Sequence, residues 1–291
     1  MVNKEIIIND YLEKLSDECL IRGFSKRTIS TYSFFVGEYL KRFSELDFDL
    51  EIGDSSLLVS KEKLKDYVLW QIKSINRSEE TIRLSLSSIS FFAKVILGVL
   101  DEVLDDLIVR PKRKKKLPKV LSYEEIQKMI DVTINIKHRL VIKIIYSSGL
   151  RLNELRNLKR ENLNLREGLI TVRNGKGGKD RLTLVAKSLS DDLLEYLSKT
   201  SFSTKYLFEG RKGKISAKTI QKIVSNAGEK AKLGKRVHPH MLRHSFATHL
   251  LNNGTDIRII QKLLGHSNLR TTQGYTYVSN TSFANIKNPL D

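Results

Sequence analysis

The stretch His238–Gly254, HPHMLRHSFATHLLNNG, predicts a helix that carries several basic side chains. Its single proline, Pro239, suits the first turn of a helix because proline needs no amide partner there. Gly254 suits the C-terminal end. We therefore expect a helix over His240–Asn252, on which the side chains four residues apart share one face.

Four histidines in this stretch look at first like a metal site: His238, His240, His244 and His249. Arg243 lies among them, and its fixed positive charge opposes a bound cation. No Glu follows His240 as a zinc-protease motif requires, and no acidic residue lies between Glu229 and Asp256. We therefore expect no metal ion and no cofactor.

The sequence on both sides of this helix is mostly helical in pattern. Helices are predicted at Leu140–Ser148, from about Leu152, and at Asp191–Ser198, Ala217–Ala231, Asp256–Leu264 and Ser267–Tyr277. Ser122 and Glu125 predict a capping box for one more helix, while Gly149 and Gly265 suit helix ends. The clear β pattern is the pair Leu169–Arg173 and Arg181–Val185, which flank a Gly-rich segment and predict a hairpin.

A basic segment divides the chain. Val109–Lys119 reads VRPKRKKKLPK, with two of the four prolines. Like charges and prolines keep such a segment extended. We predict an N-terminal domain at 1–106, a linker at 107–119 and a C-terminal domain at 120–291. The linker residues Arg113, Lys114, Lys115 and Lys116 are candidate phosphate contacts; a solvated linker or a nuclear localisation tract are the other interpretations.

The N-terminal domain is predicted to be a small all-helical bundle. Helices are expected near Asn9–Arg22, from Ser25 to about Phe43, over Lys61–Ile72 with Ser60 as its cap, and from Ser78. The last of these places Ile82, Ile89, Phe92, Ala93 and Ile96 on one buried face. The predicted fold class is mainly α, with a small antiparallel β-sheet in the C-terminal domain.

The charge is distributed unevenly between the two parts. The chain has 51 Lys and Arg against 33 Asp and Glu. Residues 1–106 hold 14 basic and 19 acidic side chains, and residues 107–291 hold 37 and 14. Such an excess of positive charge in one part of the chain indicates a polyanionic partner, most simply nucleic acid. A Lys-rich proteome is the alternative explanation.

Composition excludes other classes. With 40% hydrophobic residues the chain is globular. Its single cysteine, Cys19, excludes an internal disulfide framework. The longest apolar stretch, Ile89–Leu100, contains Lys94 and is too short to span a membrane. The N-terminus lacks a signal-peptide pattern, so we expect a cytoplasmic, nucleoid-associated protein.

Several polar residues at predicted element ends suit phosphoryl transfer. Two arginines, Arg151 and Arg243, carry paired N–H donors whose geometry suits the non-bridging oxygens of a phosphodiester. A lysine at the hairpin tip, Lys176, suits protonation of a leaving oxygen, and a histidine suits acceptance of a proton. A tyrosine can be the nucleophile. Each residue alone also has an ordinary structural explanation, such as pairing of Arg151 with Glu154; the combination indicates the chemistry.

Four motifs carry a family resemblance. They are GLRLNELRNL at Gly149–Leu158, GKGGKDR at Gly175–Arg181, HPHMLRHSFATHLLNNG at His238–Gly254, and LLGHSNLRTTQGYTYV at Leu263–Val278. In order and spacing they resemble the tyrosine recombinases of the phage integrase family, most closely the Xer type. The resemblance covers nearly all of 120–280. It extends more weakly into the first domain, where SKRTISTY and SEETIRLSLSSISFF resemble the helices of a SAM-like core-binding domain.

The resemblance implies a role for each matching residue. Arg151 and Arg243 would bind the phosphate, Lys176 would be the general acid, His240 the general base and His266 a hydrogen-bond donor to the phosphate. Tyr275 would be the nucleophile, and Glu154 would support the first arginine. Tyr275 and Tyr277 lie about 200° apart on a helix, so one of them faces the site, and the family spacing selects Tyr275.

The same resemblance implies a reaction and partners. DNA strands are cut and rejoined through a 3′-phosphotyrosine intermediate and a Holliday junction, without metal or ATP. A dimer would bind each double-stranded DNA site, a tetramer would form the synapse, and the tail Ser279–Asp291 would dock on a neighbouring protomer. We expect further DNA contacts from Lys26, Arg27, Arg77 and Arg83. Chromosome dimer resolution is the expected role; the alternatives are a mobile-element integrase, a type IB topoisomerase or a non-catalytic DNA-binding regulator.

Overall fold

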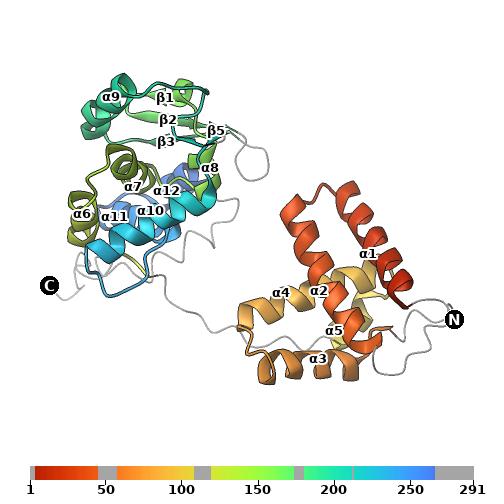
Figure 1. Cartoon of the computed structure of the whole chain (residues 1–291). Helices are drawn as coiled ribbons and strands as arrows, with labels where there is room; N and C mark the ends of the chain where they lie inside the picture. The colour runs from red at the N-terminus through yellow and green to blue at the C-terminus, as the bar shows by residue number, and fades with distance from the viewer. Residues whose placement is uncertain (1–3, 45–57, 108–118, 174–179, 212, 266–291) are drawn as a thin grey trace, which may run out of the picture. The chain divides into compact units, whose positions relative to one another are not determined.

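The computed structural model forms two compact units, Met1–Lys115 and Lys116–Asp291, here called unit 1 and unit 2 (Figure 1). It describes residues 4–44, 58–107, 119–173, 180–211 and 213–265. Each unit has a hydrophobic core of its own. Within these described ranges, no helix is long and apolar enough to cross a membrane.

Unit 1 is a bundle of helices. They are α1 (Lys4–Ile21), α2 (Lys26–Ser44), α3 (Lys61–Lys73), α4 (Glu79–Val95) and α5 (Asp101–Leu107). Ser60 and Ser78 cap α3 and α4 through their side chains, as the sequence predicts. The short helix α5 was not predicted, because its sequence DEVLDDL is too short to show a helical period.

Apolar side chains at helical spacing form the core of unit 1. Val36 and Tyr39 of α2 are fully buried, as are Ile89 and Phe92 of α4. The Tyr39 hydroxyl donates to the carbonyl of Leu58 at 3.0 Å, so its polar end has a partner inside the core. The bundle predicted for the first part of the chain is confirmed in these helices.

Unit 2 combines helices with a small sheet (Figure 1). Its helices are α6 (Tyr123–Asp131), α7 (Ile136–Ser148), α8 (Leu152–Arg156), α9 (Ser190–Lys199), α10 (Ala217–Lys230), α11 (Pro239–Asn252) and α12 (Ile257–Leu264). The capping box at Ser122 and Glu125 is present, and Pro239 begins α11. The helix predicted at Ser267–Tyr277 lies outside the described residues.

Helix α7 is the centre of unit 2. Leu140, Val141, Ile142, Ile144 and Ile145 are all fully buried, while Arg139 and Lys143 on the remaining side of the helix are partly exposed. It packs against α11, α10, α9 and α6. Burial of more than half of its circumference is expected of a helix at the centre of a domain. The helix begins at Ile136, four residues before the predicted start, because the side chain of Asn135 caps it by accepting from the main-chain N–H of His138 at 3.1 Å.

The predicted hairpin is present. Strands β2 (Leu169–Val172) and β3 (Arg181–Leu184) pair antiparallel, with Val172 opposite Arg181. The intervening residues 174–179 lie outside the described residues. Strand β1 (Leu163–Asn164) adds to β2, and β4 (Glu209–Gly210) pairs with β5 (Gly213–Lys214). These two-residue strands were not predicted, because they are too short to show an alternating pattern.

Glycine is required where α7 ends. Gly149 has a φ of 61°, which ends the helix in the left-handed conformation. A Cβ atom at this position would lie 2.5 Å from Cδ1 of Phe246 and 2.8 Å from Cδ2 of Leu264. The absence of a side chain therefore lets the end of α7 contact both α11 and α12.

We predict that Gly149→Ala lowers the free energy of unfolding by about 3 kcal/mol, because it adds left-handed strain to overpacking. Gly254→Ala is the matched control: its φ is also positive, at 81°, but nothing lies within 4 Å of the added Cβ. It should cost about 1 kcal/mol. Urea denaturation of both variants measures the difference, and equal losses would show that the contact with Phe246 and Leu264 is unimportant.

Candidate active site

One buried carboxylate organises the polar residues of unit 2. Glu154 lies in the first turn of α8, and its side chain is 7% exposed. Its Oε2 atom accepts from the main-chain N–H of Arg151 at 2.8 Å. This is the reciprocal half of a capping box, which satisfies an amide that the helix itself leaves unpaired.

Three guanidinium groups surround this carboxylate. Arg181 of β3 binds it with two parallel hydrogen bonds, Nη1 to Oε1 at 2.8 Å and Nη2 to Oε2 at 2.7 Å. Nη1 of Arg151 donates to Oε1 at 2.8 Å. Nη1 of Arg243, on α11, lies 3.8 Å from Oε2. Three positive charges therefore meet one negative charge, and the cluster has a formal excess of two.

The carboxylate remains ionised far into acid. Burial alone would raise the pKa of Glu154, but the hydrogen bonds from Arg181 and Arg151 lower it to about 2. A buried carboxylate is stable only with such partners. Glu154 is therefore a fixed negative charge across the physiological pH range, and the three arginines are held by it.

Main-chain carbonyls at two helix ends hold the same arginines. Arg243 donates to the carbonyls of Gly149 at 2.5 Å and Leu264 at 2.8 Å. Arg151 donates to the carbonyl of Gly265 at 2.9 Å. The last carbonyls of α7 and α12 lack partners within their helices and carry the negative end of the helix dipole, so cations suit them. The left-handed Gly265 and Gly149 position these carbonyls.

His240, the second residue of α11, lies close enough to Arg243 and Arg151 to be affected by their charges. Its side chain keeps part of its surface exposed. Partial burial lowers its pKa from the ordinary value, and the nearby charges of His238, Arg243 and Arg151 add to the effect. The ring is therefore neutral near pH 7 and able to accept a proton.

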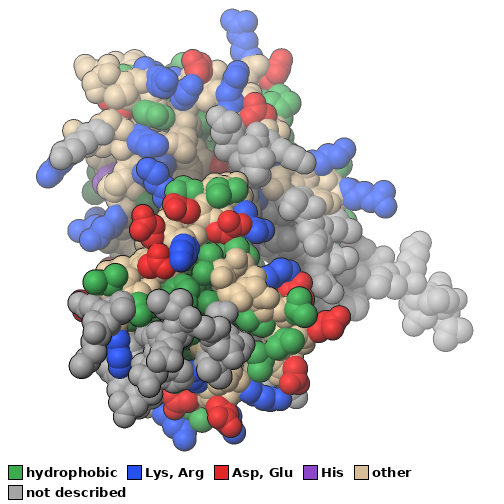
Figure 2. Space-filling view, turned by 90° about the vertical axis from the view of Figure 1, so that its right-hand side faces the viewer, with side chains coloured by type: hydrophobic (Ala, Val, Ile, Leu, Met, Phe, Trp, Pro, Cys, Tyr) green, Lys and Arg blue, Asp and Glu red, His purple; other side chains and the backbone are tan. Residues whose placement is uncertain are grey.

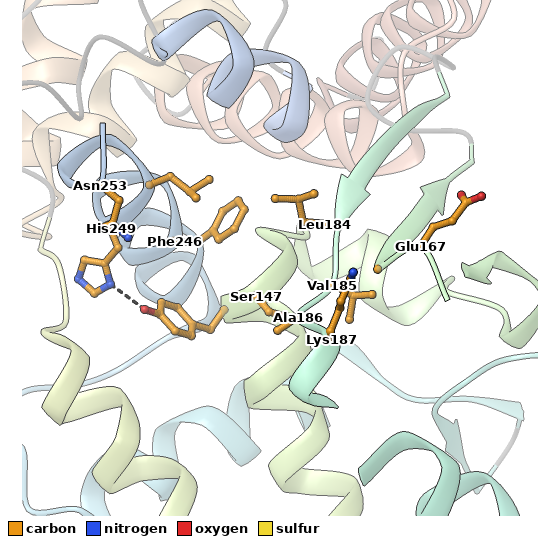
Figure 3. Close-up of a pocket in the computed structure, with 12 residues that line it drawn as sticks. Ser147, Glu167, Leu184, Val185, Ala186, Lys187, Phe246, His249 and Asn253 are labelled. Atoms are coloured by element: carbon orange, nitrogen blue, oxygen red, sulfur yellow. Dashed lines mark hydrogen bonds between the residues drawn. The ribbon is translucent and has the colours of Figure 1, made fainter. Parts of the chain in front are cut away.

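The other histidines of α11 have structural surroundings. The pKa of His244 is lowered to about 4, chiefly by burial. Nδ1 of His249 lies 2.8 Å from the hydroxyl of Tyr146, and the two rings pack edge to face. Figure 3 shows this hydrogen bond at one side of a cavity of about 420 Å³ between α7, β3 and α11. Of the predicted catalytic residues that the structure describes, Arg151, His240 and Arg243, none lines that cavity.

The structure brings together four of the residues singled out in the sequence: Arg151, Glu154, His240 and Arg243. Lys176, His266 and Tyr275 lie outside the described residues, as do Arg113, Lys114, Lys115 and Lys116. In the ranges that are described, no group of three or more His, Cys, Asp and Glu side chains is placed to hold a metal ion.

Sequence reasoning missed Arg181. Its guanidinium makes two hydrogen bonds to the Glu154 carboxylate, whereas the guanidinium of Arg151 makes one. The signal was present, because Arg181 ends the GKGGKDR motif and begins a strand. An arginine at the first position of a strand fits the alternating pattern of that strand, and no local feature points to a partner 27 residues earlier.

The predicted DNA-contact residues of unit 1 differ in their surroundings. Lys26 and Arg27, at the start of α2, are exposed, and Arg83 on α4 is half-buried. Arg77 binds the carboxylate of Glu38 with both Nη atoms and lies over the ring of Phe35. Figure 2 shows acidic side chains beside basic and apolar ones on the visible face of unit 1.

Comparison with known protein families identifies the family of this chain. Residues 119–281 match the model of the phage integrase family. The chain belongs to that family. This range includes the four motifs, the Glu154 cluster and all of the residues predicted to be catalytic.

Relatives of this phage integrase family member cover nearly its whole length. It is 38% identical to the tyrosine recombinase XerA of Pyrococcus horikoshii over 280 residues, which are 95% of this chain and 92% of the relative. It is 33% identical to the tyrosine recombinase XerD of Staphylococcus aureus over 98% of both chains.

Solved structures of the family have the same fold. A crystal structure of XerH bound to its difH substrate before cleavage has a TM-score of 0.70 at 25% identity, and the match covers 91% of this chain and 79% of that one. A crystal structure of XerA has a TM-score of 0.54 at 28% identity, covering 95% and 96%. The predicted mainly α fold with a small antiparallel sheet is therefore confirmed.

The low pKa of Glu154 predicts a pH dependence of stability. A carboxylate with a lowered pKa in the folded state stabilises the protein above its ordinary pKa, near 4.5, and this contribution disappears as pH falls towards 2. We expect Glu154→Gln to lower the free energy of unfolding by about 3 kcal/mol at pH 6, with a smaller difference from the wild type at pH 3. Urea denaturation at the two pH values measures it.

Glu195→Gln is the control for this experiment, because Glu195 forms only an exposed ion pair with Lys199. It should change the free energy of unfolding by less than about 0.5 kcal/mol. If the Glu154→Gln difference is the same at both pH values, the carboxylate is not the group that holds the cluster.

Proposed function

We propose that this member of the phage integrase family is a site-specific DNA recombinase of the Xer type. It cuts and rejoins DNA strands by transesterification through a tyrosine. The observation that carries the proposal is the pair of arginines, Arg151 and Arg243, which Glu154 and three helix-end carbonyls hold in one place. Their arrangement suits one phosphodiester.

The charge balance of the cluster supports phosphate binding. Arg151 uses two of its five N–H groups on Glu154 and Gly265, and its side chain is 22% exposed. Its other three N–H groups have no acceptor among the residues that the structure describes. A phosphodiester supplies both the missing negative charge and the missing acceptors. These donors would stabilise the charge that develops on the phosphorus oxygens in the transition state.

His240 would take the proton of the attacking hydroxyl. Its lowered pKa leaves the ring neutral near pH 7, which is the form a proton acceptor needs. Tyr275 would be the nucleophile, Lys176 would donate a proton to the departing 5′ oxygen, and His266 would hydrogen-bond the phosphate. These three assignments rest on the position of each residue in the family motifs.

The reaction needs no external energy source. Attack by the tyrosine hydroxyl forms a phosphotyrosine bond and releases a 5′ hydroxyl, so one phosphodiester replaces another. The 5′ hydroxyl of a partner strand then attacks phosphorus, the new DNA bond forms, and the tyrosine leaves with a proton. Two rounds of exchange, with a Holliday junction between them, complete recombination.

The DNA site would be bound by both parts of the chain. We assign core binding to residues 1–106, a basic linker to 107–119 and catalysis to 120–291. Two protomers on each site, four in the synapse and docking of the tail Ser279–Asp291 complete the assembly. The XerH structures, which contain difH substrate, support the DNA partner. Chromosome dimer resolution in the cytoplasm is the role we propose, since the relatives named XerA and XerD cover nearly the whole chain.

The nucleophile is tested with a nicked suicide duplex that carries the candidate site, without metal. The wild type should form a covalent protein–DNA complex on a denaturing gel. Tyr275→Phe should form none, because the attacking oxygen is removed, and Tyr277→Phe should still form it. Adducts from Tyr275→Phe but not from Tyr277→Phe would reverse the assignment, and a nicked substrate relaxed without recombination would favour a topoisomerase.

The phosphate clamp is tested with Arg151→Ala. Loss of its donors should slow cleavage about 1000-fold and weaken duplex binding less than about tenfold, since many other phosphate contacts remain. Arg156→Ala is the control on the same helix, because its guanidinium binds the carbonyl of Ile215 rather than Glu154. Cleavage by Arg151→Ala at the rate of the control would contradict the clamp.

A further inference from the structure

Arg181 has no part in the chemistry described above, yet its guanidinium makes three hydrogen bonds within the cluster. It is the first residue of β3, and its side chain is 10% exposed. Besides the two hydrogen bonds to Glu154, its Nε donates to the carbonyl of Leu263 at 2.8 Å. Three of its five N–H groups are thus used on two elements, α8 and α12.

The bidentate contact of Arg181 determines the orientation of the Glu154 carboxylate. A planar guanidinium that donates to both oxygens brings the carboxylate into its own plane, which a single point charge such as lysine does not do. With Arg181 in place, Oε1 of Glu154 is directed at Nη1 of Arg151 as well. The orientation of Arg151 therefore depends on Arg181, although the two side chains reach the carboxylate from different elements.

Packing leaves Arg181 little freedom to move. A Cβ atom on Gly265 would lie 2.8 Å from Cδ of Arg181, so the arginine stem runs directly against the glycine that ends α12. The carbonyl of this same glycine accepts from Nη2 of Arg151. Arg181 thus contacts both groups that hold Arg151, namely the Glu154 carboxylate and the main chain at Gly265.

We propose that Arg181 is a positioning residue for DNA cleavage, which acts through Glu154 to hold Arg151 in the orientation that binds the scissile phosphate. The inference rests on the proposed function. A residue that only adds positive charge would act independently of Glu154, and one that only stabilises the fold would leave the cleavage rate of the folded protein unchanged. A residue that acts through Glu154 loses its effect when Glu154 can no longer be oriented by it.

A double-mutant cycle tests this dependence. The variants are Arg181→Met, Glu154→Gln and the two combined, each assayed for covalent complex formation on the nicked duplex and for duplex binding. Arg181→Met should slow cleavage about 100-fold, the cost of a small misplacement in a site, with binding within about threefold of wild type. In the Glu154→Gln background the same substitution should slow cleavage less than about threefold.

Arg160→Ala is the matched control. Its guanidinium is also partly buried and bound to a main-chain carbonyl, that of Tyr206 at 3.0 Å, and it lies over the Phe202 ring. It contacts none of the cluster residues, so alone it should leave cleavage within about threefold of wild type. Combined with Glu154→Gln, it should leave cleavage within about threefold of the Glu154→Gln single variant. Thermal unfolding of every variant shows that the assay temperature is below its transition.

The outcomes separate this inference from the proposed function. Absence of a covalent complex with the wild-type protein would contradict the proposed function itself. If the wild type forms the complex, two results overturn the inference: an Arg181→Met rate equal to wild type, or equal slowing by Arg181→Met with and without Glu154→Gln. If Arg181→Met does not fold, Arg181→Lys replaces it in the same cycle, because it keeps the charge but not the two-pronged contact.

Discussion

The ion cluster around Glu154 is the interaction on which the rest of unit 2 depends. Removing a carboxylate from water is costly, and the cost is offset only when hydrogen-bonded cations surround it. Here the cations come from α8, β3 and α11, which are far apart in the sequence. One charge therefore defines how three elements meet, and the fold around the site must be correct before that charge can be buried.

The cluster also joins stability to function. Guanidinium groups that satisfy a buried carboxylate and helix-end carbonyls are already oriented before any substrate arrives. Such preorganisation avoids reorganisation when the phosphate binds. The excess of positive charge is unfavourable without an anion, and the phosphate of the proposed reaction would supply one. Stability contributed by Glu154 thus maintains an arrangement that is complete only with DNA.

The sequence predicted most of the fold, and it singled out four residues that the structure brings together: Arg151, Glu154, His240 and Arg243. Helix caps such as Ser60, Ser78 and Ser122 act over three residues, so local pattern is sufficient to find them. The two-residue strands and α5 were not found, because they are too short to have a period. Arg151 and Glu154 are neighbours on one helix start and were linked correctly; the bond from Arg181 to Glu154 depends on tertiary packing, which no local pattern encodes.

The carbonyls that end α7 and α12 have a further consequence for folding. Guanidinium groups from other elements donate to these carbonyls, so Arg243 and Arg151 close the last turns of these helices together with the local caps. Local fraying at these ends would release Arg243 and Arg151 together. Amide hydrogen exchange in the last turns of α7 and α12 therefore reports directly on whether the site is assembled. In this protein, the hydrogen bonds that close two helix ends are the same ones that hold Arg151 and Arg243 in place.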